Sequence, residues 1–145
     1  MSNFWVLTTY KLNEGIERKI YYNIFGGQTL YDTLDSTSSL NIVKEASVTL
    51  DLNGKTISQE KACTENYQMI YNKGDLTITG NGKISFTDSG EGDPNFRWGS
   101  YTIRNEGKLV VENGTIEHLG QQNTNSSVKH MYCAIFQYSG ETIIN

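Results

Sequence analysis

Apolar and polar residues alternate in short runs along most of this chain. Residues 48–52, for example, read Val-Thr-Leu-Asp-Leu, and similar runs follow the Asn-Gly pairs at positions 53–54, 81–82 and 113–114. Alternation with a period of two is typical of a strand that has one buried face and one solvated face. The pattern therefore predicts an all-β chain whose short strands are separated by tight turns.

One stretch of this pattern returns after 33 residues. Residues 70–78 read Ile-Tyr-Asn-Lys-Gly-Asp-Leu-Thr-Ile, and residues 103–111 read Ile-Arg-Asn-Glu-Gly-Lys-Leu-Val-Val. At the same spacing, Phe136, Gly140 and Ile144 take the places of Ile103, Gly107 and Val111. A fixed period of this size, made of short strands and turn residues, is typical of a stacked solenoid.

Two arrangements compete for the Asn-Gly pairs. Asn-Gly between alternating strands is ordinarily a strong hairpin signal. Here the strands recur in one direction at a long period, with three strands to each repeat. This predicts a right-handed parallel β-helix of about four coils, in which Leu50 lies level with Leu76 and Leu52 with Ile78.

The turn residues are expected to form the corners of the coils. Glycine takes a positive φ freely and asparagine tolerates it. Stacked asparagines at one corner are also expected to form a hydrogen-bonded ladder from Asn72 to Asn105, with Tyr138 in third place. The predicted corner residues are Asn53, Gly54, Asn72, Gly74, Asn81, Gly82, Asn105, Gly107, Asn113, Gly114 and Gly140.

The two ends of the chain depart from the repeat. Residues 1–27 do not fit it and contain two candidate strands, so we expect an attachment or oligomerisation segment there. Residues 28–145 form the predicted β-helix domain, which begins with a short capping helix because Thr29 can cap it and Leu30 and Leu34 share a face. The chain stops inside a coil, which suggests truncation or capping by another chain.

Composition and charge argue against several classes of function. The net charge of −4 and the pI of about 5.1 argue against nucleic-acid binding. No apolar stretch is long enough to insert into a membrane, and the first residues do not resemble a secretory leader. Cys63 and Cys133 are expected to be small buried thiols, with a disulfide as the alternative.

The variable segments suggest where ligands bind. Residues 59–68, 87–100 and 118–131 occupy one phase of the repeat, and insertions at one phase project from one side of a solenoid. Phe96, Arg97, Trp98 and Tyr101 are the candidate ligand-binding residues there, because aromatic rings and arginine suit sugars or a protein partner. Packing of these rings on the helix wall is the structural alternative.

Few residues suggest catalysis or metal binding. Glu91 and Asp93 could offer oxygen ligands to a cation, but a solvated acidic loop is the favoured interpretation. Adjacent Asp pairs are absent from the predicted strands, so no catalytic residue and no cofactor is predicted. Carboxylates on neighbouring coils, such as Asp75 with Glu141, leave a glycosidase as an alternative.

Residues 48–58, with residues 28–34 before them, resemble the opening of many proteins of the right-handed parallel β-helix, pectate-lyase-like superfamily. This superfamily includes polysaccharide lyases and hydrolases, phage tailspikes and fibres, and bacterial surface adhesins. The resemblance implies the fold and, for phage proteins, a homotrimer. Fold alone does not select the function. We expect a structural or adhesive virion protein that presents loops to a glycan or protein receptor, with an extracellular or cell-surface location and a polysaccharide-degrading enzyme as alternatives.

Overall fold

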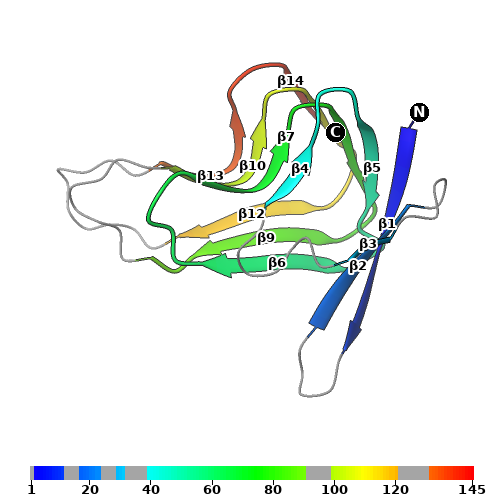
Figure 1. Cartoon of the computed structure of the whole chain (residues 1–145), viewed down its shortest axis with the longest axis horizontal. Coiled ribbons are helices and arrows are strands. Elements are labelled where there is room, and N and C mark those ends of the chain that lie inside the picture. Colours follow the sequence, from blue (N-terminus) through cyan, green and yellow to red (C-terminus); the bar gives the residue numbers. More distant parts are fainter. Residues whose placement is uncertain (1, 12–16, 24–28, 32–38, 91–98, 121–130) are drawn as a thin grey trace.

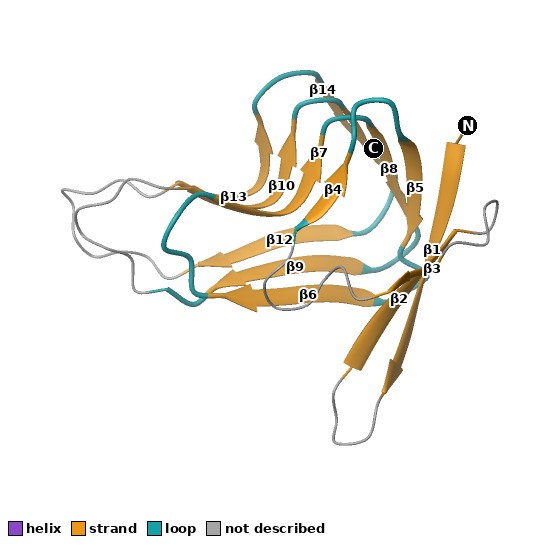
Figure 2. Ribbon diagram, in the orientation of Figure 1, coloured by secondary structure: helices purple, strands orange, loops and turns teal. Residues whose placement is uncertain are grey.

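The computed structural model describes residues 2–11, 17–23, 29–31, 39–90, 99–120 and 131–145. Within these ranges the chain is all-β, as predicted, with fourteen strands and no helix (Figures 1 and 2). The strands form three sheets, which we call A, B and C. All strand pairs are parallel except the pairs of β1 with β2 and of β2 with β3, which are antiparallel.

The three sheets differ in size. Sheet B has the order β13-β10-β7-β4, sheet C the order β12-β9-β6, and sheet A the order β14-β11-β8-β5-β1-β2-β3. The strands of sheet B are β4 (Leu40–Ile42), β7 (Tyr67–Asn72), β10 (Gly99–Asn105) and β13 (Met131–Gln137). Those of sheet C are β6 (Thr56–Lys61), β9 (Lys83–Asp88) and β12 (Thr115–Gly120). Those of sheet A are β1 (Ser2–Lys11), β2 (Glu17–Asn23), β3 (Thr29–Tyr31), β5 (Ser47–Asp51), β8 (Asp75–Thr79), β11 (Lys108–Val111) and β14 (Glu141–Ile144).

From β4 onward the chain visits sheets B, A and C in turn. The strands β4-β5-β6, β7-β8-β9 and β10-β11-β12 are three such repeat units, and β13-β14 begin a fourth. The predicted register between the second and third units is confirmed, since Ile70 pairs with Ile103 and Leu76 with Leu109. The Asn-Gly pairs join strands of different sheets, which excludes the hairpin alternative.

One hydrophobic core contains side chains from all three sheets. Leu50 of sheet A, Ile57 of sheet C and Ile70 of sheet B belong to the same buried cluster. In β6 the alternation is visible directly, because Ile57 and Gln59 are buried and their neighbours in the strand are not. Full burial of a Leu or Ile side chain stabilises the fold by about 1.5–3 kcal/mol. The core is therefore what fixes the side of each strand that faces inward.

The N-terminal strands extend sheet A. Residues 2–6 of β1 pair in parallel with β5, so the strands expected in this region are present. The predicted capping helix is wrong for residues 29–31, which form β3 and pair with residues 20–22 of β2. A helix of a few residues is marginally stable by itself. At the edge of a sheet, in contrast, the backbone N–H and C=O groups of residues 29–31 form hydrogen bonds with an existing strand. The division at residues 27 and 28 stays a prediction.

Two predicted alignments are wrong. Leu50 pairs with Ile78 and Val48 with Leu76, so Leu52 lies beyond the strand, fully buried at a corner. The run 48–52 has three apolar positions, and its sequence does not say which two of them belong to the ladder.

In the last unit β13 is displaced by one residue, because the connection between β13 and β14 spans residues 138–140 where its counterpart spans 106–107. Phe136 pairs with Arg104 and not with Ile103, whereas Ile144 pairs with Val111 as predicted. Gln137, not Tyr138, therefore pairs with Asn105.

Candidate functional site

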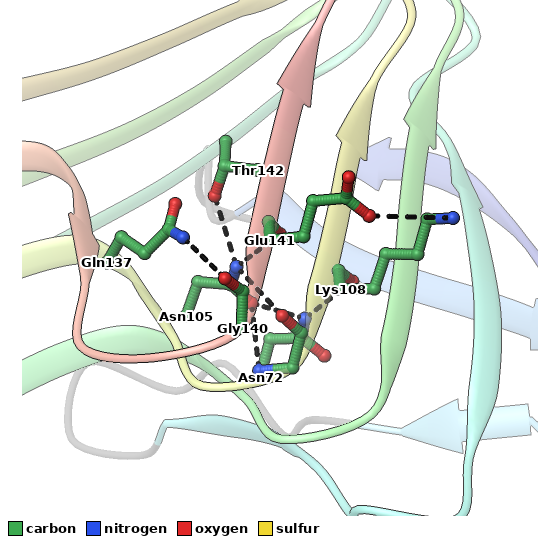
Figure 3. A network of polar contacts seen from close by, with 8 residues as sticks. Asn72, Asn105, Lys108, Gln137, Gly140, Glu141 and Thr142 are labelled. Carbon is green, nitrogen blue, oxygen red and sulfur yellow. Dashed lines mark hydrogen bonds and ion pairs between the residues drawn. The ribbon is translucent and has the colours of Figure 1, made fainter.

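The connections from sheet B to sheet A form one corner of the fold, which we call the B–A corner (residues 43–46, 73–74, 106–107 and 138–140). Beside it the predicted asparagine ladder is confirmed (Figure 3). Asn72 Nδ2 donates to Asn105 Oδ1 at 2.7 Å, and Asn105 Nδ2 donates to the Glu141 carbonyl at 2.8 Å. Both asparagines are fully buried, and exposed Gln137 completes the row by donating to the Gly140 carbonyl. The ladder is structural and does not form a ligand site.

Two glycines of the B–A corner serve a purpose other than the predicted one, whereas Gly140 has the predicted positive φ, of 78°. Gly74 and Gly107 do not have positive φ values, so the expectation was wrong for them. A Cβ atom on Gly107 would overlap the Gly74 carbonyl oxygen, which accepts a hydrogen bond from Lys108 N at 2.9 Å. Glycine is required because successive backbones approach closely.

The connections from sheet A to sheet C form the A–C corner (residues 52–55, 80–82 and 112–114). Here positive φ is observed as predicted, at 46° for Asn53, 70° for Gly54 and 101° for Gly114. Gly82 lacks a positive φ, and Gly80, which was not predicted, has one of 79°. The asparagine side chains of this corner are exposed, and the Asp51 carboxylate supports its first turn by accepting from Asn53 N at 2.9 Å.

The residues predicted to bind a ligand are only partly covered by the structure. Phe96, Arg97 and Trp98, and the weaker cation candidates Glu91 and Asp93, lie outside the described residues.

Tyr101 lies on β10 and is 6% exposed. Its ring stacks on that of Phe136, with centroids 4.5 Å apart and planes at 16°. Burial raises the pKa of Tyr101. Tyr101 thus supports a neighbouring aromatic ring and is itself mostly covered.

That neighbouring ring belongs to a surface that sequence reasoning missed. Tyr71, Arg104 and Phe136 occupy one register position on β7, β10 and β13. The Arg104 guanidinium carbon lies 5.0 Å from the ring centroid of Tyr71 and 4.9 Å from that of Tyr138. The Phe136 and Tyr138 centroids are 6.3 Å apart. We call these four residues the sheet B aromatic surface.

Hydrogen bonds hold this surface in one arrangement. Glu106 accepts from the Tyr71 hydroxyl at 2.7 Å and from Arg104 Nη2 at 2.6 Å. The Tyr71 and Arg104 donors lower the pKa of Glu106, and the same carboxylate raises the pKa of Tyr71. Lys73 also lies beside this surface, with its Nζ 4.5 Å from the Tyr71 ring centroid. Two cations, Lys73 and Arg104, and one carboxylate, Glu106, give the group one net positive charge.

The sequence contains a signal for this surface, although the aromatic residues lie far apart in it. Tyr71 and Arg104 follow Ile70 and Ile103 directly in the repeat that was recognised. Arginine and tyrosine at one register position of neighbouring parallel strands lie within cation–π distance. Listing the outward positions of each repeat would have found the pair, and the register error in the last unit hid Phe136.

A second polar group lies inside the fold, between sheets B and C. Ser100 Oγ lies 3.0 Å from His118 Nε2, and Tyr67 Oη donates to Gln59 Oε1 at 2.9 Å. Ser100 is fully buried, which excludes it as an accessible nucleophile in this conformation. The pair therefore links β10 to β12 and does not form a catalytic site.

Asp88 and the two cysteines have structural surroundings as well, and Asp88 is held by backbone hydrogen bonds. Asp88 is 2% exposed, and its Oδ1 accepts from the backbone N–H groups of Cys63 and Gly90 at 3.1 and 3.0 Å. Cys63 and Cys133 are free thiols, and Cys63 is buried as predicted whereas Cys133 is half-buried. Burial, together with Asp88, raises the pKa of Cys63 to about 12, so this thiol is unreactive at neutral pH.

The carboxylate pair weighed for glycoside hydrolysis is separated by a cation. Lys108 pairs with Asp75 on one side and with Glu141 on the other, and its Nζ lies 3.8 Å from Glu141 Oε2. Among the described residues no three His, Cys, Asp or Glu side chains come together to hold a metal ion.

The same part of the chain contains no helix long and apolar enough to cross a membrane. No protein-family model, curated protein or solved structure matches this chain.

Proposed function

We propose that the three sheets are the three faces of a right-handed parallel β-helix. The regular visiting order of the sheets, the parallel pairing and the shared core support this proposal. Right-handed connection is the rule for parallel strands joined by a crossover. A crystal structure with left-handed crossings between successive repeat units would contradict it.

We further propose that this chain is an adhesive protein that binds a glycan through the sheet B aromatic surface. The observation that carries the proposal is Arg104 held between two tyrosine rings on an outer face, with Tyr138 66% exposed. A large, rigid aromatic side chain left exposed beside a sheet is typical of a binding surface.

The chemistry of the surface suits sugars. The apolar face of a pyranose packs on an aromatic ring, and Tyr138 offers such a ring at low entropic cost because Phe136 and Arg104 fix its position. Lys73 and Arg104 add donors for hydroxyl or acidic groups. Placement in a virion appendage or on a microbial surface, and assembly as a homotrimer, belong to this proposal through the family resemblance alone.

The test is binding of the purified chain to a panel of cell-surface polysaccharides. Tyr138→Ala is expected to weaken binding of the best ligand about fivefold, which corresponds to about 1 kcal/mol of lost ring contact. Ile144→Ala is the matched control, because Ile144 is 67% exposed but lies on sheet A. Equal binding by both variants, or no binding by the parent chain, would remove the proposed function. Release of new sugar ends from the panel would favour the enzyme instead.

A further inference from the structure

Two side-chain hydrogen bonds join sheets B and C at the same register position of their strands. Tyr67 and Ser100 occupy one register position in sheet B. Gln59 and His118 occupy one position in sheet C, each opposite Phe86. The first bond joins Tyr67 to Gln59 and the second joins Ser100 to His118. The first bond joins the second repeat unit to the first, whereas the second bond lies within the third unit. Of these four residues only the histidine titrates near neutral pH.

The surroundings of His118 oppose a positive charge. Its ring packs edge-on against Phe86 with centroids 5.3 Å apart, and lies 5.6 Å from the Tyr132 ring. Its Nδ1 atom is buried and has no hydrogen-bond partner among the described residues. Ser100, which contacts Nε2, carries no charge. Burying an imidazolium in such a site costs free energy that the neutral ring does not.

The other ionisable groups nearby come from three elements. Asp88 lies on β9 two residues beyond Phe86 and favours the imidazolium, but its backbone hydrogen bonds hold it in place. Tyr132 lies on β13, and Cys63 lies in the connection from β6 to β7. Burial outweighs Asp88, so the pKa of His118 lies below its usual value.

We propose that His118 is a pH-sensitive switch that holds β12 to β10 and β13 when neutral and loosens that end of sheet C when protonated. Since the folded pKa is lowered, the stabilisation is complete above the unfolded pKa of about 6.5. It is lost as the pH falls from there through the folded pKa. The bond from Thr102 Oγ1 to the Glu117 carbonyl, at 2.7 Å, does not titrate and keeps the strand nearby. This inference does not depend on the proposed glycan binding.

The experiment is hydrogen–deuterium exchange of the whole chain at pH 7.5 and pH 5.0, corrected for the intrinsic effect of pH. Protection of β12 is expected to fall by roughly threefold or more at pH 5.0, whereas β6, held by Gln59, keeps its protection. The variant His118→Gln has glutamine at the register position that Gln59 occupies in β6. Because glutamine does not titrate, the protection of β12 in this variant should not change with pH. Loss of the response in His130→Gln, or its persistence in His118→Gln, would overturn the proposal.

A direct titration covers the case in which His118→Gln does not fold. The imidazole resonances of the unmodified chain, assigned by their contacts with Phe86, give the pKa of His118 by NMR. A value below that of a model histidine is expected. A value equal to or above it would overturn the switch regardless of the exchange data.

Discussion

The B–A corner, together with the asparagines that precede it, and the A–C corner both contain Asn and Gly but depend on them in different ways. Asn72 and Asn105 end the strands before the B–A corner, whereas the asparagines of the A–C corner lie within its connections. At the B–A corner the asparagine amides are buried and bonded across repeat units, and glycine is present because a carbonyl lies where its Cβ would be. At the A–C corner the asparagines are exposed and most of the glycines take positive φ values. Gly82 is the exception, since its Cβ would overlap the Lys55 carbonyl oxygen. Substitutions of Asn or Gly are therefore expected to have different effects on stability at the two corners.

The largest expected difference between the corners concerns their glycines. Gly107→Ala should lower the free energy of unfolding by about 3 kcal/mol, at the upper end of overpacking costs, because the new methyl group overlaps a backbone carbonyl. Gly54→Ala should cost only about 1 kcal/mol, because its strain is that of a left-handed residue. Urea denaturation of both variants measures the difference, and a larger loss in Gly54→Ala would reverse the comparison.

The next largest effect concerns the asparagines. Asn105→Ala should lower the free energy of unfolding by about 2 kcal/mol, because Asn72 and the Glu141 carbonyl lose a buried partner. The matched change at the other corner, Asn113→Ala, should stay within about 0.5 kcal/mol of the parent chain, as exposed sites usually do. Thermal melts of the two variants check this, and comparable losses would show that the ladder adds nothing.

The smallest effect tests the charged rim of the B–A corner. Glu106→Gln should lower stability by no more than about 1 kcal/mol, as expected for a surface pair. Since the pKa of Glu106 is lowered, its contribution is present above the unfolded pKa and is lost as the pH falls through the folded one. Parent and variant should therefore converge in stability as the pH falls below the unfolded pKa of about 4.3. Tyr71→Phe, which removes the first donor, should reduce the gap at pH 7, and a gap that does not narrow on acidification would contradict this assignment.

Local pattern was sufficient where successive units match in length. The pairing of Ile70 with Ile103 followed from identical spacing through Asn and Gly. Prediction of the register failed at Leu50, where an extra apolar residue left two alignments open. It also failed before the last corner, which is one residue longer than its counterpart and shifts Gln137 into register with Asn105. Register depends on how the connections pack, and a short apolar run does not contain that information.

The candidate surface was harder to predict than the fold. Tyr71, Arg104 and Tyr138 come from three repeat units and become neighbours only through parallel pairing. The residues singled out as a cluster in the sequence, Phe96 to Trp98, lie outside the described residues and stay a prediction. The helix expected near Thr29 was wrong because its strand partner in β2 is antiparallel and leaves no periodic signal in the repeat.

The most direct test of this account is the pattern of backbone nuclear Overhauser contacts in the isotope-labelled chain. Parallel register predicts contacts between Val48 and Leu76 and between Leu76 and Leu109. The same pattern should join Ile57 to Ile84 across sheet C. Contacts between the strands on either side of one Asn-Gly pair, such as Leu50 with Ile57, would show hairpins and contradict the three-sheet fold on which both proposals rest.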